Sequence, residues 1–241
     1  MFKGPNIQFL TTDYYFDYVP HPKSAKFFLP DWFKKVKNHM TKGTDLSVRS
    51  CAPFADSLNA GYIIPAPFDY YFKVTDYGVN VSWEYRDGVK NIATEKQLPG
   101  IQQHTPEQAA GLPWQPPILK LVSPWQIKTK KGWSVIITEP FNKESRPIHF
   151  FQAVVDSDAY ESPLNFPFRI INRFNQQEFE FFIKAGDPLV QVIPVQRSSL
   201  YNNPTVRTYR RQELKDARIT TKLVNSRWNY YLNNVWKRRK P

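Results

Sequence analysis

The chain has 241 residues, of which 41% are hydrophobic and 16% aromatic, so it can form one large domain, alone or with an appendage. No apolar run comes near the roughly 18 residues that span a bilayer, and the first residues lack the apolar stretch of a signal peptide, so neither a membrane protein nor an exported one is expected. The single cysteine excludes an internal disulfide and fits a reducing compartment.

The net charge of +12 is concentrated near the C-terminal end. Residues 207–241 hold eleven Lys and Arg against two acids, a net of +9, which leaves +3 for the rest of the chain. We therefore expect a folded domain over residues 1–205 and a basic extension over residues 206–241.

The first 36 residues predict a strand and a loop, followed by a short helix. The helix is expected over residues 25–36, with Pro30 in its first turn, where a missing N–H is tolerated. Its buried face would hold Trp32, Phe33 and Val36, because lysines occupy the opposite face.

Three residues between positions 48 and 69 have side chains suited to catalysis. Cys51 adjoins Arg49, but no histidine is near it in sequence, so a buried, inert thiol is the expected role. Asp56 and Asp69 would form a carboxylate pair in an enzyme. Beside serine and proline, however, capping and turn roles are commoner for aspartate.

Two motifs in this part of the chain carry a resemblance. Residues 30–34 read Pro-Asp-Trp-Phe-Lys, and residues 51–62 match Cys-x-Pro-Phe-x-Asp-x-x-x-x-Gly-Tyr. The pattern resembles that of a family of uncharacterised proteins from marine bacteriophages and some bacteria. This resemblance, which extends over residues 20–200, implies a phage origin and no particular activity.

Strand patterns dominate from residue 70 onward. Alternating side chains on both sides of Asp76-Tyr77-Gly78 predict a β-hairpin over residues 70–84. The polar, proline-rich residues 94–117 predict a long surface loop of the kind that often carries binding. Further strands are expected over residues 118–122, 132–138 and 148–155.

Residues 163–197 predict three strands joined by two tight turns, which we interpret as an antiparallel meander. Gly186 and Pro188 make the second turn sharp, since glycine accepts a positive φ and proline removes a ladder donor.

Residues 163–197 resemble the last strands of the deoxyuridine triphosphatase and deoxycytidine triphosphate deaminase β-fold, through the segment Phe-Ile-Lys-Ala-Gly-Asp-Pro-Leu-Val-Gln-Val at residues 182–192. The resemblance implies that fold. The family's catalytic pattern Gly-x-x-Asp-x-x-Tyr-x-Gly is not matched, because residues 156–160 lack the glycines. A pocket that holds Cys51, Asp56 and Asp69 near Arg169 or Gln191 would favour an enzyme of this kind.

No metal or cofactor is expected. The four histidines form none of the close pairs from which metal sites are usually built, and no phosphate loop or nucleophile elbow is present. The acids Glu139, Asp156, Asp158 and Glu161 are expected to lie on a solvated turn.

The absence of proline between residues 204 and 241 predicts one or two helices over about 210–237. The basic stripe, spaced 4, 3 and 4 residues apart, consists of Arg211, Lys215, Arg218 and Lys222. The apolar stripe beside it consists of Leu214, Ala217, Thr221, Val224, Trp228, Tyr231 and Val235. The residues expected to bind a partner are Arg211, Lys215, Arg218, Lys222, Trp228, Lys237, Arg238 and Arg239. A nucleic acid, an acidic protein or plain solvent could each face this tail.

Together these patterns predict a mainly β fold, a distorted antiparallel barrel or jelly-roll sandwich with a short N-terminal helix and a basic helical C-terminus. The first functional hypothesis is a phage-encoded, non-enzymatic protein in the virion or the host cytoplasm, acting on a virion or host protein. The alternatives are a nucleotide-binding or nucleotide-modifying enzyme and a nucleic-acid binder. A homo-oligomer is compatible with each, and no membrane partner is expected.

Overall fold

The structure is a computed structural model that describes residues 7–37, 47–85, 100–113, 117–143, 146–226, 230–231, 234 and 236. The chain divides into two compact units. The first, here called the β unit, comprises Met1–Leu29 and Asn59–Leu200. The second, here called the helical unit, comprises Pro30–Leu58 and Tyr201–Pro241.

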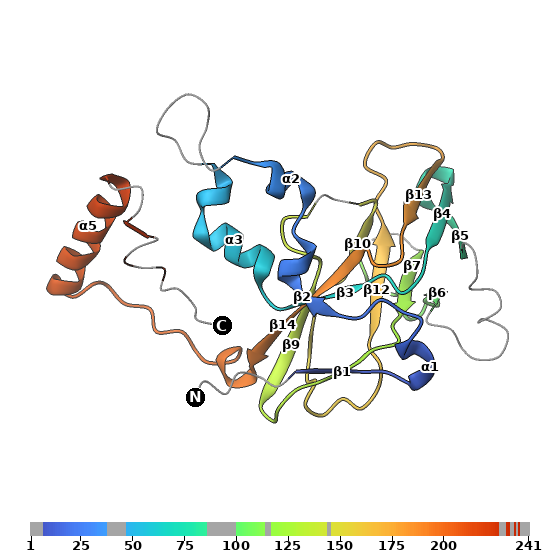
Figure 1. Ribbon diagram of the computed structural model, residues 1–241, viewed down its shortest axis with the longest axis horizontal. Helices are drawn as coiled ribbons and strands as arrows, with labels where there is room; N and C mark the ends of the chain where they lie inside the picture. The colour runs from blue at the N-terminus through green and yellow to red at the C-terminus, as the bar shows by residue number, and fades with distance from the viewer. Residues whose placement is uncertain are drawn as a thin grey trace. The chain divides into compact units, whose positions relative to one another are not determined.

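The described strands belong to the β unit and pair antiparallel in four sheets (Figure 1). The five-stranded sheet has the order β11 (Ala153–Val155), β9 (Trp133–Thr138), β14 (Pro188–Gln196), β3 (Tyr62–Pro65) and β2 (Lys23–Ser24). The four-stranded sheet has the order β10 (Ile148–Phe150), β12 (Asn165–Ile170), β7 (Ile118–Val122) and β6 (Ile101–Gln103). The smaller sheets are β13 (Phe179–Ile183) with β4 (Tyr70–Thr75) and β5 (Asn80–Tyr85), and β1 (Gln8–Leu10) with β8 (Gln126–Lys128).

These sheets confirm the predicted mainly β fold. In the part of the chain that the structure describes, no sheet closes into a barrel, and the arrangement fits a distorted jelly-roll-like sandwich. The predicted hairpin is β4 and β5, paired from Tyr70–Tyr85 to Thr75–Asn80. The strand over 118–122 is β7, and the strand over 132–138 is β9.

One aromatic core joins the sheets of the β unit. Tyr70, Phe72 and Val74 point inward from β4, because alternate side chains of a strand face opposite sides. Phe72 is fully buried, stacks on Phe181 of β13 with centroids 4.6 Å apart, and meets Phe168 of β12 edge-on at 6.2 Å. The three-stranded and four-stranded sheets therefore share one interior.

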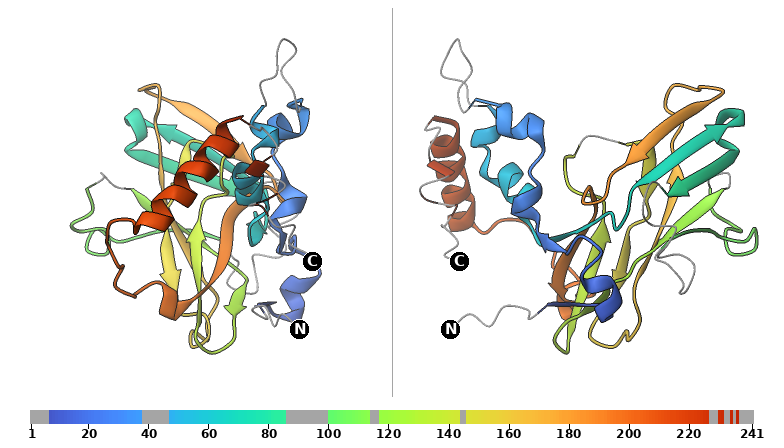
Figure 2. Two further views of the ribbon diagram at one scale, coloured as in Figure 1. Left: turned by 90° about the vertical axis from the view of Figure 1, so that its left-hand side faces the viewer. Right: turned by 45° about the vertical axis from the view of Figure 1, so that its right-hand side comes forward.

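The predicted meander over residues 163–197 is wrong in its pairing. β12 pairs with β10 and β7, β13 lies beside β4, and β14 lies between β9 and β3 (Figure 1; Figure 2). The turn before β14 has the expected Gly186 at φ +87°. Its backbone nevertheless bonds to Ala66, which donates to Asp187 O at 2.8 Å and accepts from Gly186 N–H at 2.9 Å. The turn thus connects two sheets and closes no hairpin.

Two segments that the sequence predicts as single elements are divided further in the structure. The strand expected over 148–155 is two short strands, β10 and β11, which lie in different sheets. The loop expected over 94–117 contains β6, which pairs with β7 from Ile101–Leu121 to Gln103–Leu119, while residues 94–99 and 114–116 lie outside the described residues. In both places three-residue strands are too short to produce a clear alternating pattern.

Near the N-terminus, the strand expected within residues 1–22 is β1, and α1 (Asp13–Phe16) follows it. The helix expected over 25–36 is two pieces, the 3₁₀ turn η1 (Ala25–Phe28) and α2 (Asp31–Lys35). Pro30 lies between them as the N-cap of α2, with φ −59°.

The helical unit contains α2, the 3₁₀ turn η2 (Val48–Ser50), the body of α3 (Ala52–Asn59) and α5 (Arg211–Ser226). Phe33 of α2 is buried as expected and stacks on Phe54 of α3, with centroids 5.9 Å apart. Trp32 meets the same ring edge-on at 6.0 Å. In the described residues, the helices are too short or too polar to cross a membrane.

Candidate functional site

Cys51 is exposed, so the expectation of a buried thiol is wrong. The residue lies where η2 ends and α3 begins, and its carbonyl accepts the Ala55 N–H at 3.0 Å. The neighbouring Arg49 donates to Lys34 O at 2.6 Å and Val36 O at 3.2 Å, so it caps the C-terminal end of α2.

Asp56 and Asp69 hold distant parts of the chain together. Asp56, on α3, accepts a 2.9 Å hydrogen bond from the indole N–H of Trp236. Asp69, between β3 and β4, accepts the Ala185 N–H at 2.6 Å, which agrees with the expected turn role. Both carboxylates therefore have contacts that serve the fold.

Gln191 is 1% exposed and bridges two loops of the β unit. Its side-chain oxygen accepts the Phe141 N–H at 2.7 Å, and its amide donates to Ala60 O at 2.6 Å. Arg169 is half-buried on β12, opposite His149 of β10. Of the five residues considered for a pocket, Cys51 and Asp56 belong to the helical unit and the other three to the β unit.

The acids near residue 156 do not lie on a simple solvated turn. Asp158 has an 8% exposed side chain and is paired with the Arg197 guanidinium, whose Nε lies 2.9 Å from Asp156. The Ser134 hydroxyl donates to Asp156 and the Gly132 N–H to Asp158, both at 2.8 Å. Glu161 forms a separate ion pair with Lys128 at 2.6 Å.

The Gly132 N–H and the Arg197 guanidinium lower the pKa of Asp158 below its usual value. A lowered folded-state pKa adds stability above the unfolded pKa, about 3.9, and that stability is lost as pH falls through the folded pKa. We expect the urea midpoint to fall between pH 5 and pH 3, and to fall less in Asp158→Asn. The control Asp17→Asn, on an exposed residue at the end of α1, should follow the wild type. An equal fall in all three proteins would contradict the prediction.

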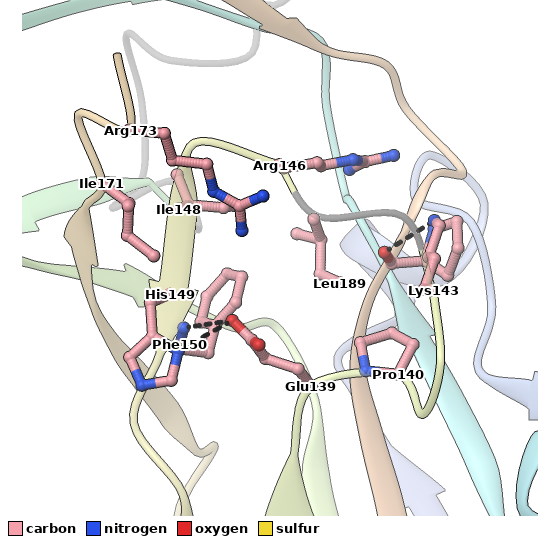
Figure 3. A pocket seen from close by; sticks show the side chains of 11 residues that line it. Glu139, Pro140, Lys143, Arg146, Ile148, His149, Phe150, Ile171, Arg173 and Leu189 are labelled. Atoms are coloured by element: carbon pink, nitrogen blue, oxygen red, sulfur yellow. Dashed lines mark hydrogen bonds and ion pairs between the residues drawn. The ribbon is translucent and has the colours of Figure 1, made fainter. Parts of the chain in front are cut away.

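A cavity of about 140 Å³ lies in the β unit where β9, β10, β14 and the chain after β12 meet (Figure 3). Arg146, Arg173, Glu139 and His149 are among the polar residues on its wall. In the view of Figure 3, Arg173 points toward the centre of the cavity and Arg146 crosses above Leu189. The other residues on its wall are Pro140, Lys143, Ile148, Phe150, Ile171 and Pro188.

Hydrogen bonds and ion pairs fix several of these side chains, and Nζ of Lys143 donates to Pro188 O at 3.3 Å. A carboxylate oxygen of Glu139 accepts the Phe150 N–H at 2.9 Å and lies 3.3 Å from Nδ1 of His149. Nη2 of Arg146 lies 2.8 Å from Asp187. Nη1 of Arg146 is buried and, within the described residues, has no hydrogen-bond partner.

The C-terminal helix begins where predicted. Arg207 forms a bidentate ion pair with Glu213, in which each guanidinium nitrogen lies 2.7 Å from a carboxylate oxygen. Glu213 also accepts the Arg210 N–H at 2.8 Å and so caps the N-terminus of α5. None of residues 211–224 is buried, and Ile219 is 56% exposed. In the described part of the chain, no ion pair is formed by Arg211, Lys215, Arg218 or Lys222. The other predicted binding residues, Trp228, Lys237, Arg238 and Arg239, lie outside the described residues.

Comparison with known proteins gives no family. No protein-family model matches the chain, and no curated protein does. Among solved structures, the chain is similar to a point mutant of the dUTPase from phage phi11 of S. aureus, a structure described for its coordination of a structural Mg(II) ion. The two are 11% identical with a TM-score of 0.37, and the match covers 86% of this chain and 96% of that one.

Proposed function

We propose that the chain is a phage-encoded, non-enzymatic interaction protein whose C-terminal helix docks on an acidic surface of a virion or host protein. The observation that carries the proposal is that α5 has an apolar stripe and a basic stripe, yet no buried side chain over residues 211–224. A helix with this pattern is stabilised mainly by a surface that covers its apolar side. The phage origin rests on the motifs at residues 30–34 and 51–62.

The charge of the helix favours an acidic occupant. Arg211, Lys215, Arg218 and Lys222 follow one face for about 16 Å, since each residue advances a helix by about 1.5 Å. Carboxylates on a partner would complement this face and speed association. A second copy of the chain is disfavoured, because residues 207–241 carry +9 in each copy.

The apolar stripe favours a protein over other anionic surfaces. Leu214, Ala217 and Val224 lie on one side of the helix, and Leu214 and Val224 are 36% and 38% exposed. A protein partner would cover these side chains together with the basic face. A nucleic acid is the second candidate, favoured by four basic side chains that form no ion pair with any described residue. It would engage them through its phosphates and leave the apolar stripe without a role.

The enzyme alternative rests on the resemblance of residues 163–197 alone.

The test captures proteins on the immobilised full chain from a nuclease-treated lysate of the source cells, and then measures the Kd of the purified partner. The basic variant replaces four residues by Gln: Arg211, Lys215, Arg218 and Lys222. A charge-matched control replaces four exposed lysines by Gln: Lys35, Lys73, Lys131 and Lys184. A third variant, Leu214→Ser with Val224→Ser, removes the apolar stripe.

We expect the basic variant and the apolar variant each to weaken the partner's binding about tenfold or more, because several modest contacts act together. The control should bind as the wild type does. Circular dichroism checks that α5 persists, which glutamine favours. Failure to capture any partner, binding that both variants keep, or capture seen only from a parallel lysate without nuclease would each overturn the proposal. Tight binding to duplex DNA that only the basic variant loses would replace it with the nucleic-acid candidate.

A further inference from the structure

We propose that the cavity between Arg146 and Arg173 is a binding site for a phosphate group, carried either by inorganic phosphate or by a small phosphorylated metabolite. The site lies in the β unit and is independent of the C-terminal helix. The two phage-like motifs do not include it, since both end before residue 63, and the dUTPase-like segment at residues 182–192 contributes only Pro188 and Leu189 to its wall.

The volume of the cavity limits the size of the group that can bind inside it. Its volume of about 140 Å³ is below the roughly 300–1,000 Å³ typical of sites that enclose a whole cofactor or drug-sized molecule. A water molecule occupies about 30 Å³ in the liquid, so the cavity has room for four or five atoms of this size. A tetrahedral oxyanion has five heavy atoms and fits this space. A nucleoside attached to it would have to remain outside.

The charge on the wall favours an anion. Lys143, Arg146 and Arg173 are cationic, whereas Glu139 is the one acid on the wall among the described residues. The Glu139 carboxylate is already engaged, because it accepts the Phe150 N–H and contacts Nδ1 of His149 (Figure 3). Ile148, Ile171 and Leu189 form apolar walls, and charges attract more strongly beside such walls than in open water.

The geometry of Arg146 points to a missing acceptor. Asp187 holds Nη2 of its guanidinium at 2.8 Å, and Asp187 is held in turn by the Lys184 N–H at 3.0 Å. This pair holds one end of the guanidinium. Nη1 is buried without a partner in the described chain, and a buried donor left unpaired costs about 1–3 kcal/mol. A phosphate oxygen would accept from Nη1, and Arg173 would supply the second cationic contact.

The experiment is isothermal titration of the full chain at constant ionic strength with four solutes. These are inorganic phosphate, ribose 5-phosphate, acetate and chloride. The variants are Arg146→Gln and Arg173→Gln, and the matched control is Arg218→Gln, which removes one positive charge from α5. Melting temperatures show whether each variant is folded, and Arg173→Gln keeps the test valid if loss of the Asp187 pair unfolds Arg146→Gln.

We expect phosphate or ribose 5-phosphate to bind, with acetate and chloride at least tenfold weaker. Each cavity variant should raise the Kd about tenfold or more, and the control should leave it unchanged. Similar affinity for both phosphates would show that the site recognises the phosphate group alone, which favours free phosphate, while at least tenfold tighter binding of ribose 5-phosphate would favour a phosphorylated metabolite. The absence of binding at millimolar phosphate, equal binding of acetate, or binding kept by folded cavity variants would overturn the proposal.

Discussion

Gly61→Ala is expected to lower the melting temperature by roughly 10 °C. Gly61 has φ +66°, and a Cβ built there would lie 2.1 Å from the backbone oxygen of Val192 in β14. The left-handed conformation costs a non-glycine residue about 1–2 kcal/mol. Relief of the clash requires a shift of a strand that is hydrogen-bonded on both sides, which adds about 1–3 kcal/mol. For a chain of this size, each kcal/mol corresponds to about 2–4 °C.

Gly111→Ala is the matched control. Gly111 also has a positive φ, +81°, but an added Cβ would meet no atom within 4 Å. Its variant should show only the conformational cost, about 1–2 kcal/mol or a few degrees in thermal unfolding. If the two variants melted at the same temperature, the clash between the added Cβ and Val192 would not be what destabilises Gly61→Ala.

Gln191→Leu should destabilise the protein by about 2–4 kcal/mol in urea unfolding. Leucine has a similar volume but leaves the Phe141 N–H and the Ala60 carbonyl without the bonds that Gln191 now makes. Each buried polar group that loses its partner costs about 1–3 kcal/mol, and solvent near the exposed Phe141 side chain reduces that loss.

Gln196→Leu, on an exposed residue at the end of the same strand, is the control and should change the free energy of unfolding by less than about 0.5 kcal/mol. The comparison also distinguishes the structural role of Gln191 from the ligand-binding role that the dUTPase-like resemblance suggested. A Gln191→Leu protein with unchanged stability would remove the structural explanation and return Gln191 to the candidate binding residues.

The elements that the sequence predicted well have local causes. The β4–β5 hairpin follows from strand alternation around Asp76-Tyr77-Gly78, and the start of α5 follows from Glu213 three residues after Arg210. Strand partners have no such local cause. The turn at Gly186 looks like a hairpin, but its hydrogen bonds to Ala66, 120 positions earlier in the chain, direct β14 into another sheet. Long-range bonds of this kind leave no local pattern.

The candidate sites show the same limit. The Asp158–Arg197 pair joins residues 39 positions apart, so the local sequence near residue 156 predicts only a solvated turn. The phosphate cavity takes its polar residues from three separate segments, around residues 139–149, 173 and 187. Each of these residues is an ordinary surface type, and no spacing rule connects them. The one available signal was the number of arginines and lysines close to the ends of β10 and β12.

The division of the helical unit into Pro30–Leu58 and Tyr201–Pro241 has a consequence for synthesis on the ribosome. Its first segment emerges early, but the second emerges only after residues 59–200 have been translated. During that interval the Phe33–Phe54 aromatic pair can form, while Asp56 waits for Trp236, 180 positions later. The helical unit is therefore completed last, and a nascent or prematurely terminated chain can fold its β unit while half of its helical unit has nothing to pack against.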